Sequence, residues 1–394
     1  MDGASERSAP DQVRGDRSYV GIVTETFPPD VNGCAMTLGH LVEWLLAQGH
    51  DVQLVRPSRH RRERAHFDGA LHVVPRRSMR IPLYRIQRFG LPAPCYLHRM
   101  WHARPPDVAY VATEGPLGYS ALIVAERFHI PVVSGFHTNF QNYGTYYGIP
   151  FLRPAIQSYL RSFHNRSVAT LVPTAQQSRQ MREGGFVNTQ VLGRGVDTAL
   201  YSPARRSPEL RRSWGLEPDD LAVLYVGRLA EEKNIGLAAE AFRAMQKVDP
   251  RAKFVLVGDG PSREGLEKAN PDFVFCGWRT GEDLAAHYAS GDVFLFPSTS
   301  ETFGNVTTEA LASGLAVVAF NYAAAEVHIN HGESGMLAAF DDREDFTRAA
   351  VALASDPDLV ARLRPAARRV AEGISWDRIC GQFEAILLEH ARPR

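Results

Sequence analysis

The sequence has little cysteine and no long apolar run. Its four cysteines, Cys34, Cys95, Cys276 and Cys380, are widely spaced and form no C-x-x-C pair. This spacing argues against a zinc site or a disulfide framework and fits a reducing cytoplasm. No apolar run approaches the roughly 18 residues that span a membrane. Residues 1–17 are polar and lack the apolar core of a signal peptide, so we expect a loose tail.

Lysine is missing from the first half of the chain, and charge is unevenly divided. Residues 1–200 hold 22 arginines, no lysine and 15 acidic residues, which gives a formal charge of +7. Residues 201–394 hold 22 basic and 29 acidic residues, which gives −7. A length of 394 residues suggests two domains of ordinary size, and their opposite charges predict that they have different partners.

The basic excess is concentrated in residues 56–88, which contain ten arginines against only Glu63 and Asp68. One interpretation is a solvated loop. The other is attraction to an anionic membrane surface, worth about 1 kcal/mol for each basic residue near the headgroups. Both interpretations stay open. No nucleic-acid recognition motif accompanies the charge, which argues against nucleic acid as a partner.

Short apolar runs alternate with helical stretches in both halves, as in parallel sheets crossed by helices. The runs lack polar alternation, which indicates strands that are covered on both faces. In the first half they are residues 19–24, 51–56, 107–112, 131–136 and 169–173; in the second half they are residues 222–227, 253–258, 273–277, 292–297 and 316–320.

The sequence therefore predicts an α/β fold: two Rossmann-like, doubly wound parallel-sheet domains that face each other across a cleft. The domains are residues 18–200 and 201–375, and the Pro- and Arg-rich residues 201–212 are the predicted linker. Residues 376–394 begin with an amphipathic helix over 376–390. Ligands of such sheets bind beyond the carboxyl ends of the strands, so the turns after the strands hold the candidate site.

Two cations follow the first strand of the second half. Arg228 and Lys233 lie five positions apart in a short loop that leads into a helix, where both side chains can reach one anion. The alternative is a pair of surface cations next to Glu231 and Glu232. After the next strand, Gly258 belongs to a turn that allows close backbone approach. The glycine spacing of "GDGPSREG" does not fit G-x-G-x-x-G, which argues against an oxidoreductase.

The stretch "SETFGNVTTEALASG" (300–314) follows another strand and places Glu301 and Glu309 eight positions apart. Phe303, Gly304 and Asn305 form the predicted turn, and a helix from about Val306 directs its free N–H groups to the cleft, where they can bind an anion. Glu309 is suited to a pair of ribose hydroxyls, and Glu301 to the hydroxyls of a sugar. The alternative for Glu309 is a carboxylate that the helix dipole tolerates.

The first half offers Gly33, His137 and a group of aromatic residues. Gly33 ends a strand-exit loop at the start of a helix, where amides can meet a phosphate, unless the loop is a plain turn. His137 follows a strand at the cleft, although a lone histidine is often structural. The aromatic residues of segment 136–154 fit either a core or an interfacial surface; they are Phe136, Phe140, Tyr143, Tyr146, Tyr147 and Phe151.

Taken together, these residues resemble the retaining glycosyltransferases of family 4, which have the two-domain GT-B fold. The resemblance covers residues from about 18 to 390. Its carriers are "ETFGNVTTE" for E-x-F-G-x-x-x-x-E, "GRLAEEKN" for G-R-L-x-x-x-K-x, "VNG", "VGDGP", the histidine of "FHTNF" and the terminal Trp-containing helix. The filling "NVTTEA" is more polar than the commoner aliphatic form, so the donor cannot be assigned by analogy.

The resemblance implies a role for each candidate. Arg228 and Lys233 would bind the donor pyrophosphate, and Glu309 the ribose. The transferred sugar would meet Glu301 and His137. Other donor-binding candidates are Gly33, Gly258, Phe303, Gly304, Asn305 and Val306, with Gly277 and Trp278 beside the base. The last helix would cross back to the first domain.

The implied activity is retaining, metal-independent hexosyl transfer. The leaving nucleoside diphosphate needs no protonation if cations meet its developing charge. No cofactor is expected, because the nucleotide sugar is a substrate. GDP-mannose, UDP-glucose and UDP-glucuronate are the candidate donors. The resemblance favours a peripheral enzyme at the cytoplasmic membrane face that glycosylates a lipid such as a diacylglycerol. Alternatives are a soluble enzyme acting on a polysaccharide or small metabolite, a sugar-nucleotide epimerase and a non-catalytic nucleotide-sugar sensor.

Overall fold

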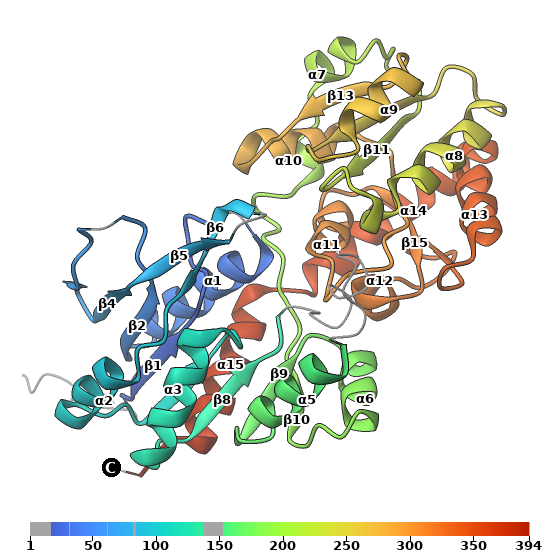
Figure 1. The fold of residues 1–394 in the computed structure, drawn as a ribbon. Coiled ribbons are helices and arrows are strands. Elements are labelled where there is room, and N and C mark those ends of the chain that lie inside the picture. The colour runs from blue at the N-terminus through green and yellow to red at the C-terminus, as the bar shows by residue number, and fades with distance from the viewer. Residues whose placement is uncertain (1–16, 31, 61, 82–83, 138–152, 394) are drawn as a thin grey trace, which may run out of the picture.

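The structure is a computed structural model that describes residues 17–30, 32–60, 62–81, 84–137 and 153–393. Its chain folds into two lobes, each built on one large sheet with helices on both faces (Figure 1). The first sheet has the order β10-β9-β8-β7-β1-β2-β4-β3, and the second has the order β13-β12-β11-β14-β15-β16. All strand pairs of both sheets are parallel except β3 with β4. The predicted fold class is confirmed.

Up to residue 200, the first lobe contains ten strands and five helices among the described residues. The sheet strands are β1 (Tyr19–Val23), β2 (Asp51–Pro57), β3 (His66–Asp68), β4 (Leu71–Arg76), β7 (Val108–Val111), β8 (Val132–Gly135), β9 (Ala169–Val172) and β10 (Thr189–Val191). A separate hairpin pairs β5 (Ser78–Ile81) with β6 (Tyr84–Gly90). The helices are α1 (Gly33–Ala47), α2 (Pro94–Ala103), α3 (Pro116–Arg127), α5 (Arg153–His164) and α6 (Ala175–Glu183).

The second lobe contains the remaining elements except the last helix of the chain. Its strands are β11 (Ala222–Val226), β12 (Lys253–Val257), β13 (Val274–Gly277), β14 (Val293–Phe296), β15 (Ala316–Phe320) and β16 (Met336–Ala338). Its helices are α7 (Pro208–Ser213), α8 (Ile235–Gln246), α9 (Arg263–Ala269), α10 (Gly281–Ser290), α11 (Asn305–Ala312), α12 (Ala323–His328), α13 (Arg343–Ser355) and α14 (Pro357–Glu372). The short 3₁₀ turns η2 (Pro203–Arg205) and η3 (Glu231–Lys233) complete it.

All ten predicted strands are present, because each is an apolar run, and all except the edge strand β13 are buried over most of their length. Strands β11, β14 and β15, for example, are buried along their whole length. The prediction missed β3 to β6, β10 and β16. Strands β3, β10 and β16 have only three residues each and lie at sheet edges, β5 and β6 form the separate hairpin, and β4 contains polar residues and a proline.

The last helix, α15 (Trp376–His390), belongs to the first lobe. It buries Cys380, Phe383 and Leu387 in the core that contains α1 and β1, and it lies beside these elements in Figure 1. The carboxylate of Glu384 accepts hydrogen bonds from Trp44 Nε1 at 2.8 Å and lies 2.9 Å from a ring nitrogen of His50. The chain thus returns to the first lobe after completing the second.

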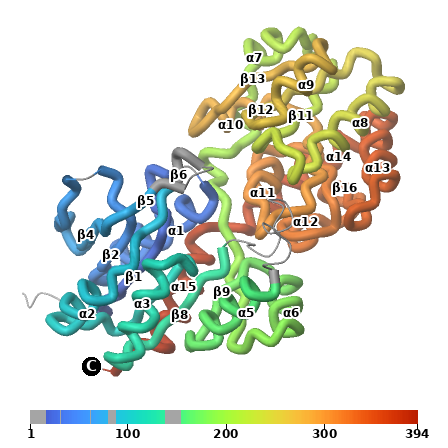
Figure 2. The backbone as a smooth tube through the Cα atoms, viewed as in Figure 1, coloured from blue at the N-terminus to red at the C-terminus, as the bar shows by residue number. Residues whose placement is uncertain are grey.

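The two connections between the lobes lie side by side (Figure 2). One follows β10 and the other precedes α15; Val196 N donates to Ile374 O at 3.0 Å between them. A side chain on Gly195 would place its Cβ 2.7 Å from the Cα of Trp376, so only glycine fits this close crossing. The contacts between the two connections fix the position of one lobe relative to the other.

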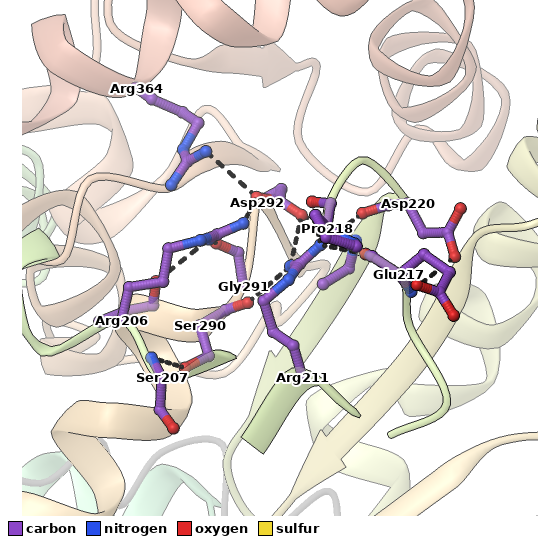
Figure 3. Close-up of polar contacts among 12 residues, drawn as sticks. Arg206, Ser207, Arg211, Glu217, Pro218, Asp220, Ser290, Gly291, Asp292 and Arg364 are labelled. Carbon is purple, nitrogen blue, oxygen red and sulfur yellow. Dashed lines mark hydrogen bonds and ion pairs between the residues drawn. The ribbon is translucent and has the colours of Figure 1, made fainter. Parts of the chain in front are cut away.

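The predicted linker 201–212 is ordered and packs on the second lobe. It contains η2 and most of α7, and two of its arginines bind Asp292 at the start of β14 (Figure 3). Arg206 Nη2 lies 2.8 Å from Asp292 Oδ1, and Arg211 Nη1 lies 2.9 Å from Oδ2. Arg364 of α14 adds a third contact, at 3.1 Å from Oδ1. The buried carboxylate of Asp292 therefore links three segments of the chain to the start of β14.

We expect Asp292→Asn to destabilise the second lobe strongly. The substitution leaves three partly or fully buried guanidinium groups without their carboxylate, and breaking a buried ion pair typically costs about 3–5 kcal/mol. Denaturant unfolding measures this change. The matched control is Glu240→Gln, which breaks an exposed pair with Arg343 and should cost about 1 kcal/mol or less. Equal stability of the two variants would contradict the role of Asp292.

Candidate active site

Groups from both lobes meet at the carboxyl ends of the two parallel sheets. Gly33 begins α1 in the first lobe, and Asn305 begins α11 in the second. A side chain on Gly33 would place its Cβ 3.3 Å from Asn305 Nδ2. The loops that follow β1, β8, β11 and β14 therefore border one shared space. This is the place where sheets of this kind bind ligands.

A close ion pair joins two of the predicted site residues. Lys233 Nζ lies 2.5 Å from Glu301 Oε1, and Ser298 Oγ donates to the same oxygen at 2.7 Å. The turn η3 places Lys233 just ahead of α8, with Asn234 in the left-handed conformation at φ 54°. Burial opposes the ionisation of Glu301, but Lys233 and Ser298 together hold its pKa below the usual value. The cleft thus contains an ionised carboxylate and its cation.

Arg228 has a different partner. Its guanidinium pairs with Glu232 one turn further along the chain. The sequence predicted that Arg228 and Lys233 converge on one anion; here each is paired with its own carboxylate. The loop that carries Arg228 is held by Tyr225, whose hydroxyl donates to Arg228 O at 3.1 Å.

The turn before α11 is built as the sequence predicted, with the helix starting one residue earlier, at Asn305. Gly304 has φ 91°, a left-handed conformation that favours glycine. Phe303 is buried, and its carbonyl accepts from Ala324 N at 2.8 Å. Tyr322 donates to Glu301 O at 2.5 Å. These contacts fix the turn that directs the start of α11, including Val306, toward the cleft.

Glu309 lies on α11 against two tyrosines. Tyr288 of α10 donates to Glu309 Oε2 at 2.9 Å, and Tyr201 also acts on the pKa of this carboxyl group. Burial raises the pKa of Glu309 to about 7, although the two tyrosines partly offset this. The carboxyl group therefore changes its charge close to neutral pH.

His137 is held between Tyr110 and Arg194. Its Nε2 lies 2.7 Å from the Tyr110 hydroxyl, and Arg194 Nη2 lies 3.3 Å from its Nδ1. Since arginine only donates, Nδ1 accepts and Nε2 carries the proton. Burial, followed by the nearby Arg194, lowers the pKa of His137 to about 3. The imidazole is therefore neutral, with both ring nitrogens bound to protein groups.

The predicted glycines after β12 and β13 have different surroundings. A Cβ on Gly258 would lie 1.9 Å from Gly227 O, so this glycine allows two neighbouring loops of the second lobe to pack together. That contact supports the loop of Arg228. Gly277 has φ 69°, and Trp278 beside it is 57% exposed at the end of β13. Its ring is available to stack on a planar ligand group.

Sequence reasoning missed Arg194. Its side chain is 6% exposed and lies between the lobes, with its guanidinium carbon 5.9 Å from the centre of the Phe303 ring. A Cβ on Gly33 would lie 3.3 Å from Arg194 Nη1. The residue follows the three-residue strand β10, which was not predicted, so no signal placed it at the edge of a sheet.

Some residues of the Arg-rich segment 56–88 and of the aromatic segment 136–154 make contacts within the first lobe, and others are exposed. Arg56 is buried and pairs with Glu63, and Arg76 stacks on Tyr96, so neither is free to meet a membrane. Phe136 belongs to the core. Exposed side chains of segment 56–88 include Arg59, Arg62, Arg64, Arg77, Phe67 and Met79. Arg61 and the aromatic residues Phe140, Tyr143, Tyr146, Tyr147 and Phe151 lie outside the described residues.

The described residues contain neither a metal-binding cluster nor a membrane-spanning helix. In that part of the chain, no group of three or more His, Cys, Asp or Glu side chains is arranged to hold a metal ion. Within the same ranges, none of the helices combines the length and apolar character required to span a bilayer.

Comparison with known proteins agrees with this geometry. Residues 31–200 match the family model "Glycosyltransferase Family 4", and residues 220–356 match "Glycosyl transferases group 1". A GDP-mannose-dependent alpha-mannosyltransferase of Mycobacterium tuberculosis (strain CDC 1551 / Oshkosh) is 34% identical over 387 residues, with 93% of this chain and 96% of the relative covered. An alpha-monoglucosyldiacylglycerol synthase of Acholeplasma laidlawii is 26% identical, with 87% and 90% covered.

Among solved structures, the sucrose-phosphate synthase of Thermosynechococcus elongatus is similar with a TM-score of 0.74 and 18% identity, covering 95% of this chain and 99% of that one. This likeness shows the fold, which is GT-B. The mannosyltransferase, in contrast, is similar in sequence over nearly the full length of both proteins. The chain therefore belongs to glycosyltransferase family 4.

Proposed function

We propose that this glycosyltransferase moves a hexose from a nucleotide sugar to a hydroxyl group of a diacylglycerol-type membrane lipid, with retention of configuration. The Lys233–Glu301 pair at the meeting point of the lobes carries the proposal, because it offers a cation for phosphate next to a carboxylate for sugar hydroxyls. The names of the two relatives support the donor and the acceptor. One uses GDP-mannose, and the other makes a glucosyl diacylglycerol.

The leaving group in this reaction is a nucleoside diphosphate. As the bond from the sugar C1 to the phosphate oxygen breaks, negative charge develops on the phosphate. Lys233, Arg228 and the N–H groups at the start of α11 are the groups that meet this charge. Lys233 then turns from Glu301 toward the phosphate. A leaving group stabilised in this way needs no general acid, and these protein cations replace a divalent metal.

Glu301 and Glu309 have separate roles in this proposal. Glu301 is ionised beside Lys233 and accepts hydrogen bonds from hydroxyls of the transferred sugar. Glu309 accepts from the ribose hydroxyls, in place of or beside Tyr288. Neither acts as the acid, base or nucleophile of a glycosidase pair. The acceptor hydroxyl attacks C1 from the side of the departing phosphate, which takes its proton, so the configuration is retained.

The first lobe supplies the proposed membrane contact. Arg59, Arg62, Arg64 and Arg77 are exposed in the Arg-rich segment, together with Phe67, which is 71% exposed, and Met79, which is 53% exposed. Arginines attract anionic headgroups, and apolar side chains enter the interface between headgroups and acyl chains. This combination supports a peripheral enzyme at the cytoplasmic membrane face that works on a lipid without spanning the bilayer.

We expect Lys233→Ala to lower turnover by roughly 10²–10³, because the variant lacks a preorganised cation at the leaving phosphate. Arg228→Ala should have an effect of the same order. Steady-state release of nucleoside diphosphate measures both. The control is Lys247→Ala at the other end of α8, which should leave turnover unchanged. Turnover within a few-fold of the wild type in Lys233→Ala would remove this residue from its role.

Donor binding should depend on the ionisation of Glu309. The pKa of this group is about 7 in the fold, so it gains a proton as the pH falls through 7 and then loses acceptor capacity. Donor affinity should therefore fall below pH 7. The group's contribution to folding stability has the opposite dependence: it is full below the unfolded value of about 4.5 and is lost as pH rises through 7.

Calorimetric titration with the donor between about pH 5.5 and 8.5 measures this dependence. Glu309→Gln should bind weakly at every pH, with a flat profile. The control is Glu25→Gln, because the pKa of Glu25 is also raised to about 7 by burial, while its carboxylate accepts from backbone N–H groups at Gly90 and Leu117. That variant should keep the profile of the wild type. An unchanged profile in Glu309→Gln would contradict the ribose assignment.

The acceptor is tested with GDP-mannose, UDP-glucose or UDP-glucuronate and diacylglycerol in anionic vesicles. We expect a glycolipid product, and we expect replacement of Arg62, Arg64 and Arg77 by Gln to weaken vesicle binding by roughly 10², at about 1 kcal/mol for each arginine. Replacement of the exposed Arg212, Arg251 and Arg348 of the second lobe is the control. Product formed only with polysaccharide or small acceptors would exclude the lipid, and donor binding without any product would indicate a sensor.

A further inference from the structure

Arg194 is a buried cation that has no carboxylate partner among the described residues. Within the described ranges, its side chain has a polar contact with His137 Nδ1 at 3.3 Å, and its guanidinium faces the Phe303 ring. The two other cations of the site differ in this respect, since Lys233 pairs with Glu301 and Arg228 pairs with Glu232. Arg194 is therefore a site cation that forms no ion pair with a carboxylate in the described part of the chain, although Glu301 lies near enough to act on its pKa.

An unpaired buried guanidinium is unfavourable. Burial lowers the pKa of Arg194, while Cys34, Tyr110 and Glu301 oppose this shift. Arginine nevertheless keeps its proton in proteins, because its pKa starts above 12. Taking an ion out of water costs several kcal/mol unless a counter-charge is close. A site that keeps such a group between two lobes is suited to receive an anion there.

The surroundings of Arg194 are the starts of two helices. A Cβ on Gly33 would lie 3.3 Å from Arg194 Nη1 and 3.3 Å from Asn305 Nδ2. Two N–H donors from different segments therefore lie close against the backbone of Gly33, where α1 begins, and one of them belongs to the first residue of α11. The Oδ1 atom of Asn305 is buried and has no hydrogen-bond partner within the described chain. This oxygen accepts hydrogen bonds, so it is suited to a hydroxyl group of a ligand, while the N–H donors are left for its anionic part.

The N–H donors of Arg194 and Asn305 favour an oxyanion as their ligand. The planar fork of arginine matches the spacing of phosphate oxygens, and charged donors bind phosphate more strongly than neutral ones. Asn305 also begins α11, whose N-terminal end favours negative charge. Glu301 and His137, the candidate sugar-binding residues, are neighbours of Arg194. An oxyanion bound by Arg194 therefore lies close to the sugar.

We propose that Arg194 is a third cationic ligand of the donor diphosphate and binds the phosphate next to the transferred sugar. The inference rests on the proposed function. Arg194 Nη1 donates to a phosphate oxygen at the starts of α1 and α11, while Nη2 keeps its contact with His137 Nδ1. The segment between the lobes therefore contributes directly to the leaving-group site, and the same guanidinium fixes the tautomer of His137.

Calorimetry with GDP and UDP, and with the matching monophosphates, tests this assignment. Arg194→Gln should weaken binding of the diphosphate that the wild type binds by roughly 10–100-fold, the usual effect of losing one charged hydrogen bond. Binding of the monophosphate should change less than about threefold. Arg194→Lys, which keeps the charge, should recover part of the diphosphate affinity. If Arg194→Gln does not fold, Arg194→Lys and Arg194→Met are compared in its place, and the charged variant should bind diphosphate more tightly.

The control variant is Arg182→Gln. Arg182 of α6 binds the side chain and carbonyl of Thr189 at the start of β10, away from the cleft, so its loss perturbs the same strand without removing a site cation. It should bind diphosphate as the wild type does. A similar loss in this variant would attribute the Arg194 effect to movement of the strand and overturn the proposal.

Three further results would overturn the inference. Diphosphate binding within threefold of the wild type in a folded Arg194→Gln would show that the residue does not touch the phosphate. Equal weakening of monophosphate and diphosphate would show a general distortion. Weakening confined to UDP-glucuronate would assign Arg194 to a sugar carboxylate. If the wild-type protein binds neither GDP nor UDP, the proposed function itself fails, and this inference fails with it.

Discussion

The ion pair between Lys233 and Glu301 is the interaction on which the site depends. It joins the loop after β11 to the loop after β14, and its two members come from positions 68 residues apart in the chain. Without Lys233, burial would raise the pKa of Glu301 and favour its neutral form. The pair therefore keeps an ionised carboxylate and its cation in a partly buried cleft, where electrostatic interactions are stronger than in water. In the proposed reaction, substrate binding exchanges this internal partner for phosphate and sugar.

The second constraint is the position of the two lobes relative to each other. Both connections pass the same point, where Val196 and Ile374 are hydrogen-bonded and Gly195 packs on Trp376. Arg194 lies one residue before this crossing and reaches both His137 of the first lobe and Phe303 of the second. The cleft is thus formed by three parts of the chain: the loops of each sheet and the segment between them. A change in the angle between the lobes would move the cations relative to one another.

Much of this arrangement follows from the sequence. Strands buried on both faces produce apolar runs, so the two sheets, the positions of Lys233 and Glu301 after strands and the position of Glu309 in the following helix could be predicted. The partners of these residues could not, because ion pairs such as Arg228–Glu232 depend on side-chain conformation. Arg194 was missed since β10 has only three residues and a polar start. The contacts of the predicted linker 201–212 could not be predicted either, because its arginines gave no sign of the distant Asp292 that binds them.

The central claim is that protein cations alone stabilise the departing diphosphate while the acceptor enters from the same side. The most direct measurement is a time-resolved proton NMR experiment on the anomeric signal of the first-formed product, made in the presence of EDTA with an α-configured nucleotide sugar. We expect an α-linked product and the same turnover with EDTA as with Mg²⁺. A β-linked product, or turnover that is lost in EDTA and restored by Mg²⁺, would contradict it.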